Sequence, residues 1–317
     1  MSVYTAVSTA ELAVFLTGYP LGTAVACEGI LEGVENTNYF LTTTRGRYVL
    51  TLFEATPAAD LPFFLDLMAH LADRGLPVPR PARRHDGGQA ALLCGRPAAI
   101  LQRLPGRSPE RPDAARCAAV GDLLGRMHVA VADFGSTRAS TRGAAWRAEV
   151  GARLLTRLGP ADQALLREEL ALQDTQPLAG LPGGVVHGDL FRDNVLFEDT
   201  TLTGVIDFYY AAHDSLLYDL AVTVADWCFD RGGWSSERVT ALLHAYRAQR
   251  AVTPAEIAAW PVALRAAGLR FWLSRLQDAL FPKPGSLVLI KDPAQCRALM
   301  LTARREAARL TACWAHG

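Results

Sequence analysis

Apolar positions in the first hundred residues follow two spacings, that of a helix and that of strands. Leu12, Phe15 and Leu16 recur at helical spacing behind Ser8-Thr9-Ala10-Glu11, a capping-box pattern, which predicts a short first helix. The segments after it are short apolar runs bounded by turn residues, with one amphipathic stretch among them. Strands are predicted over 24–31, 38–43, 48–53, 90–93 and 98–101, and a helix over 61–71. This part of the chain is predicted to be a small antiparallel sheet.

The pattern changes to long helical spacing after residues 105–113, which are rich in proline, arginine and polar residues. We place the domain boundary there, with a hinge near 101–106. Helices are predicted from residue 113, over 144–157 and 160–173, and over most of 219–314. The predicted fold class is α+β, with residues 1–104 as a small sheet lobe and residues 105–317 as a larger, mainly helical lobe. His128, in the first of these helices, is interpreted as a buried core or capping residue.

Composition narrows the functional classes. Half of the 317 residues are hydrophobic, the formal net charge is zero, and the arginines are scattered, which argues against a nucleic-acid-binding face. The six cysteines contain no CxxC pair, so we expect reduced thiols in a cytoplasmic protein. No basic segment followed by an apolar core begins the chain, and no apolar run reaches about eighteen residues. We therefore expect no signal peptide and no membrane span.

The segment from His187 to Asp207 is the most informative in the chain. His187, Asp189 and Asn194 have the spacing of the kinase catalytic loop, in which an aspartate orients the attacking hydroxyl and an asparagine binds the metal. Two short apolar strands follow, and the second ends at Asp207. Mg²⁺ prefers oxygen ligands. The pattern therefore predicts phosphoryl transfer, with Asp189 as catalytic base and Asn194 and Asp207 as metal ligands.

Each of these residues alone is typical of an ordinary loop between buried strands, and only the combination at this spacing favours a phosphotransferase. His187 is interpreted as a structural brace of the loop backbone. Asp219 opens a later helix, where it is placed either to cap that helix or to hydrogen-bond back to the catalytic loop.

Nucleotide contacts are predicted at two places in the sheet lobe. The turn between the first two strands carries Asn36, Thr37 and Asn38, whose backbone amides and short side chains can cradle phosphates. An ordinary hairpin turn rich in Asn and Gly is the alternative. At the hinge, backbone groups beginning at Leu101 are expected to meet the adenine of ATP.

With these residues in view, the chain resembles the aminoglycoside phosphotransferase/choline kinase-like superfamily, whose members share the two-lobed protein-kinase-like fold. The segments 33–40, 48–54, 63–65, 75–79 and 271–276 are similar to bacterial homoserine kinases of that superfamily. The resemblance covers nearly the whole chain. It implies an enzyme that uses ATP and Mg²⁺ to phosphorylate the side-chain hydroxyl of L-homoserine, a step in threonine biosynthesis.

One position departs from the wider superfamily. Kinases place a lysine on the third strand, where it pairs with nucleotide phosphates. Here that position is Thr51, and the only lysines are Lys283 and Lys291. Arg47 lies on the same strand face but about 13 Å away, an imperfect substitute. The homoserine kinases resemble this chain in that substitution, so its presence is compatible with an active enzyme. The alternative is a catalytically silent pseudokinase that binds nucleotide.

A zwitterionic amino acid needs an acidic group for its amine and a donor for its carboxylate. Asp226 and Asp230 are the candidates for the amine, and Arg192 and Arg275 are the candidates for the carboxylate, because a guanidinium matches a carboxylate bidentately. A surface charge or an intrahelical pair is the alternative for each. Kinases for choline, ethanolamine, an amino sugar or an aminoglycoside remain alternatives, since several tyrosines and tryptophans can form an aromatic cage for a quaternary amine.

Overall fold

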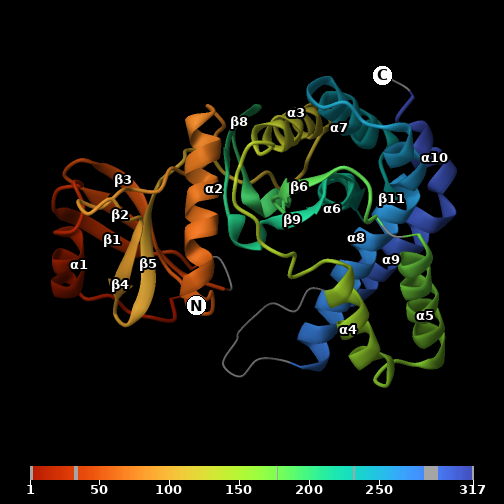
Figure 1. Ribbon diagram of the computed structural model, residues 1–317, viewed down its shortest axis with the longest axis horizontal. Helices are drawn as coiled ribbons and strands as arrows, with labels where there is room; N and C mark the ends of the chain where they lie inside the picture. The colour runs from red at the N-terminus through yellow and green to blue at the C-terminus, as the bar shows by residue number, and fades with distance from the viewer. Residues whose placement is uncertain (1–2, 32–34, 177, 231–232, 282–291, 316–317) are drawn as a thin grey trace. The chain divides into compact units, whose positions relative to one another are not determined.

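The computed structural model describes the chain apart from residues 1–2, 32–34, 177, 231–232, 282–291 and 316–317 (Figure 1). The chain divides into two compact units, Met1–Pro105 and Gly106–Gly317. The first unit is dominated by an antiparallel sheet and the second by helices, so the predicted α+β class is confirmed. Among the described residues, the structure contains no helix with the length and apolarity needed to cross a membrane.

A five-stranded antiparallel sheet forms the frame of the first unit, in the order β1-β2-β3-β5-β4. Its elements are α1 (Thr9–Leu16), β1 (Ala24–Gly29), β2 (Thr37–Thr43), β3 (Gly46–Leu52), α2 (Leu61–Asp73), β4 (Ala90–Leu93) and β5 (Arg96–Gln102). Buried residues alternate along β2, because one face of the sheet packs on α1. The Ser8–Glu11 capping box begins α1 as predicted.

The second unit begins with helices and places three short strand pairs among them. Its helices are α3 (Ala114–Ala130), α4 (Ala144–Leu155), α5 (Pro160–Thr175), α6 (Leu216–Trp227), α7 (Ser236–Gln249), α8 (Pro254–Leu280), α9 (Pro293–Arg305) and α10 (Ala307–Ala312). Its strands are β6 (Gly183–Val186), β7 (Val195–Glu198), β8 (Thr201–Val205), β9 (Ala212–Ser215), β10 (Phe229–Asp230) and β11 (Gly233–Trp234). They pair antiparallel as β6 with β9, β7 with β8 and β10 with β11.

Two elements of this unit differ from the sequence prediction. Residues 212–215 form β9, for which the sequence predicted no strand, because they pair with β6 at the register Val186 to Ala212. The local sequence Ala-His-Asp-Ser has little strand propensity, so the pairing depends on a distant partner. Helix α6 begins at Leu216 with Ser215 as N-cap, earlier than the predicted start at Asp219.

Helices α3 and α7 lie side by side (Figure 1), and two glycines on α3 permit their close approach. A Cβ atom on Gly121 would stand 2.1 Å from the carbonyl oxygen of Leu242, and one on Gly125 would stand 2.9 Å from that of Tyr246. Both contacts are with backbone atoms that cannot move aside independently of the helix. Glycine at these two positions therefore sets the α3–α7 spacing and brings the side chain of His128 onto Tyr246.

Helix α8 packs against α4, α5, α6 and α9 and forms the core of this unit (Figure 1). A capping box between Thr253 and Glu256 fixes its start. Further along, Arg265 donates two hydrogen bonds, of 2.9 and 2.7 Å, to the buried carboxylate of Glu169 on α5. Paired, bidentate contacts of this kind satisfy a charge that burial would otherwise penalise.

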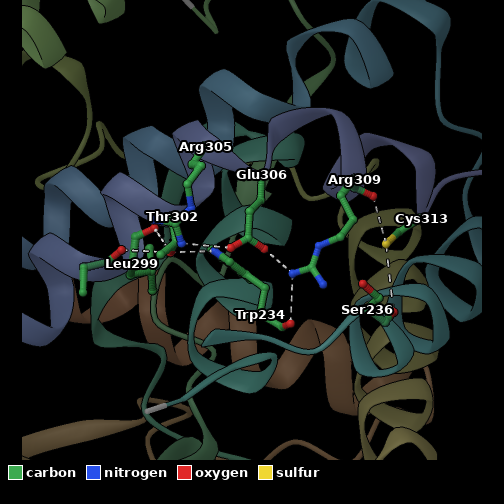
Figure 2. A network of polar contacts seen from close by, with 9 residues as sticks. Trp234, Ser236, Leu299, Thr302, Arg305, Glu306, Arg309 and Cys313 are labelled. Carbon is green, nitrogen blue, oxygen red and sulfur yellow. Dashed lines mark hydrogen bonds and ion pairs between the residues drawn. The ribbon is translucent and has the colours of Figure 1, made fainter. Parts of the chain in front are cut away.

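A network of polar contacts joins the carboxyl-terminal helices α9 and α10 to β11, as Figure 2 shows. Glu306, at the junction of α9 and α10, accepts hydrogen bonds from the guanidinium groups of Arg305 and Arg309. Arg309 also donates to the carbonyl oxygen of Trp234 at 3.1 Å, and the indole N–H of Trp234 donates to the Thr302 hydroxyl at 3.0 Å. These contacts hold α9 and α10 in place and involve none of the predicted site residues.

Candidate active site

The predicted catalytic loop connects β6 to β7 within the second unit, and it turns sharply at Gly188. The φ angle of Gly188 is +75°, a left-handed conformation that glycine adopts readily. A Cβ atom there would lie 3.0 Å from the carbonyl oxygen of Tyr210. The backbone path between His187 and Asp189 therefore requires glycine, where protein kinases carry arginine.

Asp219 holds the start of this loop through its backbone amides. Its carboxylate accepts hydrogen bonds from the N–H groups of His187 at 3.0 Å and Gly188 at 2.8 Å, and from Nε2 of His128 at 3.0 Å. The carboxylate is fully buried. Burial by itself raises the pKa of Asp219, but the contacts with His128, His187 and Gly188 outweigh it and lower the pKa. An ionised carboxylate thus fixes the loop, which is the second of the two positions predicted for Asp219.

The His187 ring joins the loop to the end of β8. Its Nδ1 accepts the N–H of Asp189 at 3.2 Å, so Nε2 carries the hydrogen that is donated to the carbonyl oxygen of Ile206 at 3.0 Å. The ring also packs on Phe208, with a centroid distance of 4.6 Å. Burial lowers the pKa of His187, which favours the neutral ring that this pattern of hydrogen bonds requires.

The carboxylate of Asp189 has different surroundings at its two oxygens. Oδ1 accepts a hydrogen bond from Nη2 of Arg270 at 2.7 Å. Oδ2 has one contact with a described residue, the amide nitrogen of Asn194 at 3.4 Å, which is too long for a strong hydrogen bond. The same amide nitrogen donates to the backbone carbonyl of Asp189 at 2.8 Å. Oδ2 is therefore the less constrained of the two carboxylate oxygens.

Arg270, on α8, was not among the residues predicted from the sequence. Its side chain is 6% exposed, and burial alone lowers the pKa of Arg270. The neighbouring carboxylate of Asp189 more than offsets that effect, so the pKa is raised and the guanidinium stays charged. One feature of the sequence could have identified Arg270. It directly precedes Phe271, the first residue of the segment 271–276 that is similar to the homoserine kinases.

Asn194 and Asp207 lie at the same end of the β7–β8 hairpin. Val195 pairs with Val205, and the N–H of Ile206 donates to the carbonyl oxygen of Asn194 at 2.9 Å. Asp207 follows with a left-handed φ of +65° and an exposed side chain. The hairpin register therefore explains why residues thirteen positions apart in the sequence arrive together.

The donor set at this end of the hairpin fits a magnesium ion. The amide nitrogen of Asn194 is used within the loop, which leaves its amide oxygen for a ligand, and Asp207 supplies a carboxylate. Among the described residues there is no cluster of three or more His, Cys, Asp or Glu side chains suited to a metal. Mg²⁺ bound with nucleotide needs only one or two protein oxygens, because phosphates and water fill the remaining positions.

Arg192 and Asp226, predicted as separate anchors for the two charged groups of the substrate, contact each other. The Asp226 carboxylate accepts hydrogen bonds from the backbone N–H of Arg192 at 2.8 Å and from its Nε at 3.1 Å. Asp230 pairs with Arg238 at 2.6 Å. Arg275 is half-buried on α8, and no ion pair joins it to a described residue. Arg192 and Asp226 therefore tie the catalytic loop to α6.

The residues predicted to contact phosphates in the first unit are already engaged in part. The Thr37 hydroxyl donates to Glu54 at 2.6 Å and accepts the backbone N–H groups of Tyr4 and Thr5. Asn36 is buried, and its side-chain oxygen has no partner among the described residues. The beginning of the same predicted turn, residues 32–34, lies outside the described residues.

Thr51, predicted to occupy the position of the kinase lysine, forms a neutral pair with a residue of the neighbouring strand. The hydroxyl of Thr51 on β3 donates to the side-chain oxygen of Asn38 on β2 at 2.7 Å. These residues are direct partners in the β2–β3 register. Leu101 is buried on β5, opposite Val49. The Thr51 side chain is thus part of the sheet's own hydrogen bonding.

Behind the catalytic loop, a chain of buried polar groups runs from Asp219 to the start of α8. The Tyr246 hydroxyl lies 2.8 Å from Nδ1 of His128 and accepts a hydrogen bond from Arg250 at 2.9 Å. Arg250 also donates to the buried Glu256 at 2.7 Å. Because Nε2 of His128 donates to Asp219, its Nδ1 is left to accept the Tyr246 hydroxyl hydrogen. His128 therefore has a buried structural position, as predicted.

Comparison with known proteins identifies relatives over the whole chain. A sequence model of the phosphotransferase enzyme family matches residues 26–281. A protein of Methylobacillus flagellatus named homoserine kinase is 45% identical over 317 residues, covering 100% of this chain and 99% of that protein. One of Neisseria meningitidis serogroup B with the same name is 44% identical over 304 residues, covering 95% and 99%.

The fold is shared with solved kinases. The structure of amicoumacin kinase in complex with AMP-PNP, Ca²⁺ and Ami matches with a TM-score of 0.67 at 18% identity, over 88% of this chain and 87% of that one. Together with the sheet-then-helices order, this likeness confirms the predicted two-lobed kinase-like fold. The chain belongs to the phosphotransferase enzyme family and, within it, to the group whose named members are homoserine kinases.

Proposed function

We propose that this protein transfers the γ-phosphoryl group of ATP to the side-chain hydroxyl of L-homoserine, forming O-phospho-L-homoserine and ADP. The observation that carries the proposal is an intact His187–Asp207 segment in a chain 45% identical, end to end, to a homoserine kinase. A kinase-like loop alone supports phosphoryl transfer to some alcohol. The full-length relatives support homoserine as that alcohol and, with it, a role in threonine biosynthesis.

In this mechanism Asp189 is the catalytic base. With Oδ1 held by Arg270, Oδ2 orients the substrate hydroxyl and accepts its proton as the oxygen attacks the γ-phosphorus in line. A bond forms between the substrate oxygen and phosphorus, and the bond from phosphorus to the bridging oxygen of ADP breaks. The contacts of His187, Asp219 and Asn194 keep the loop in one conformation, so that little reorganisation accompanies the reaction.

A magnesium ion held by Asn194 and Asp207 would neutralise charge on the β- and γ-phosphates. For the nucleotide, we propose contacts from Asn36, whose buried side chain has an oxygen that no described residue contacts, and from backbone groups of Thr37, Asn38 and Leu101. Backbone N–H groups are favoured at Thr37 and Asn38 because their side chains already hydrogen-bond to Glu54 and Thr51.

The test is ADP release from Mg-ATP in a coupled assay with L-homoserine, L-serine, choline, ethanolamine and an aminoglycoside as acceptors. We expect turnover with L-homoserine to exceed that with every other acceptor, and removal of Mg²⁺ with EDTA to abolish it reversibly. Turnover with another acceptor and none with L-homoserine would refute the substrate assignment. Silence with every acceptor would favour the pseudokinase.

The same assay tests the base. Asp189→Asn keeps the shape of the side chain and removes its basicity, so kcat should fall by roughly a hundredfold or more. Asp174→Asn, an identical change at an exposed position of α5, is the matched control and should leave kcat unchanged. An Asp189→Asn enzyme with most of its activity would contradict the assignment.

A further inference from the structure

Arg270 has a buried nitrogen that no described residue satisfies. Its Nη2 donates to Asp189, whereas Nη1 is buried and has no hydrogen-bond partner. The residue as a whole is 5% exposed. A charged donor that is removed from water and left unpaired costs free energy, so proteins seldom retain one without a ligand for it. Nη1 and Nη2 belong to the same guanidinium, and Nη2 contacts the proposed base, Asp189. A ligand bound to Nη1 would therefore lie beside the reacting atoms.

The surroundings of the guanidinium indicate what that ligand is. The rings of Phe271, Phe191 and Tyr210 lie 5.0, 5.6 and 5.8 Å from its central carbon, and they leave an apolar environment on those sides. Asp189 already offsets the charge of the guanidinium, so what Nη1 lacks is a hydrogen-bond acceptor, and an ionised acceptor forms the strongest hydrogen bond with it. A carboxylate accepts a charge-assisted hydrogen bond from a guanidinium nitrogen with good geometry.

We propose that Nη1 of Arg270 binds the α-carboxylate of the amino-acid substrate, while Nη2 continues to hold Asp189. This inference rests on the proposed function. It identifies Arg270 as the residue that makes the enzyme prefer an amino-acid substrate to a simple amino alcohol. Four bonds separate the hydroxyl oxygen of homoserine from its carboxylate carbon, a span of at most about 5 Å. The two nitrogens of one guanidinium are bonded to the same carbon, so both ends of the substrate can be bound together.

The two arginines predicted from the sequence are weaker candidates. Arg192 already donates to Asp226 through Nε and its backbone N–H. Arg275 is also on α8, but no described contact links it to Asp189 or to the catalytic loop. Arg270 alone of the three joins the proposed base directly.

The experiment compares two substrates that differ only in the carboxylate, L-homoserine and 3-aminopropan-1-ol. For the wild-type enzyme, kcat/KM should favour L-homoserine by about 10- to 100-fold, the range expected for one charge-assisted hydrogen bond. In Arg270→Gln this ratio should collapse towards one. Arg270→Lys keeps a cation beside Asp189 but loses the fork, so it should retain more turnover and still lose most of the ratio.

The ratio separates carboxylate binding from a purely electrostatic role. If Arg270 only positions Asp189, its variants slow both substrates equally and the wild-type ratio persists, which would overturn the proposal. A wild-type enzyme with equal kcat/KM for both substrates would overturn it without any variant. A collapse of the ratio in Arg275→Gln, with Arg270→Lys unaffected, would give the carboxylate to Arg275.

An arginine on the surface provides the matched control. Arg304→Gln removes a half-exposed arginine that pairs with Glu168 on the surface, and it should change neither substrate's kcat/KM. Failure of the wild-type enzyme to phosphorylate L-homoserine at all would refute the proposed function. That result is distinct from loss of the ratio in an enzyme that remains active.

Discussion

Replacing Tyr246 with phenylalanine tests whether the buried polar chain behind the catalytic loop contributes to stability. The substitution deletes one hydroxyl from a fully buried side chain and leaves its shape unchanged. That hydroxyl accepts a hydrogen bond from Arg250 at 2.9 Å and donates to Nδ1 of His128 at 2.8 Å. Burial raises the pKa of Tyr246, so the group is neutral at every pH at which the protein is handled.

The magnitude follows from what the deletion leaves behind. A neutral hydrogen bond contributes about 1 kcal/mol and one to a charged donor about 1.5–3 kcal/mol, so the loss should be about 2–4 kcal/mol. The free pair of electrons on His128 Nδ1 has no access to water, because that residue is buried. For a unit of this size, the destabilisation corresponds to a melting temperature lower by roughly 5 to 15 °C.

Tyr19 provides a control of opposite expected sign. Its hydroxyl, in the first unit, is also buried but forms no hydrogen bond with any residue that the structure describes, and burial raises its pKa to about 12. Tyr19→Phe should therefore leave the free energy of unfolding unchanged or increase it. Calorimetry of the full chain, with each variant's transitions compared with those of the wild type, makes the measurement. A Tyr246→Phe protein within about 0.5 kcal/mol of wild type would refute the reasoning.

Two further predictions concern the loop itself. Gly188→Ala places a Cβ atom 3.0 Å from the Tyr210 carbonyl oxygen at a φ of +75°, so kcat should fall at least about tenfold. Steady-state kinetics would detect the loss. Gly135→Ala is the control, because a Cβ atom there would meet nothing within 4 Å. Burial lowers the pKa of the His187 ring, so below about pH 6.5 the unfolded state binds a proton that the folded state does not bind. The free energy of unfolding should therefore decrease as pH falls below about 6.5, by up to about 1.4 kcal/mol per pH unit. Urea unfolding at pH 5 to 7.5 measures this slope, and His187→Asn should flatten it; an unchanged slope would show that another group is responsible.

The sequence was most informative where local patterns decide the structure. The capping box at Ser8–Glu11, the paired strands of the first unit and the kinase-like spacing from His187 to Asp207 all operate over short separations. Hydrophobic period and turn residues are sufficient to place such elements. The loop spacing also placed Asp189 and Asn194 together, because only four residues separate them.

Contacts between distant segments were the part that sequence patterns missed. Arg270 reaches Asp189 across 81 positions, and His128 reaches Asp219 across 91. The segment 271–276, which directly follows Arg270, also contains Arg275, so its similarity to the homoserine kinases does not show which of the two arginines contacts Asp189. Charge type selected Arg192 and Asp226 as separate substrate anchors, but their contact with each other was not predicted, because they are 34 positions apart in the sequence.

Helix α8 connects the two sets of contacts that define the geometry of Asp189. Near its start, Glu256 ends the polar chain that fixes the loop backbone through Asp219. Roughly 21 Å further along the helix axis, Arg270 contacts the Asp189 carboxylate. Since one helix supports both the loop's anchor and the partner of the proposed base, a shift of α8 changes the position and the charge environment of Asp189 together. The geometry of Asp189 therefore depends on the packing of α8 against α4, α5 and α9, as well as on the loop that carries the motif.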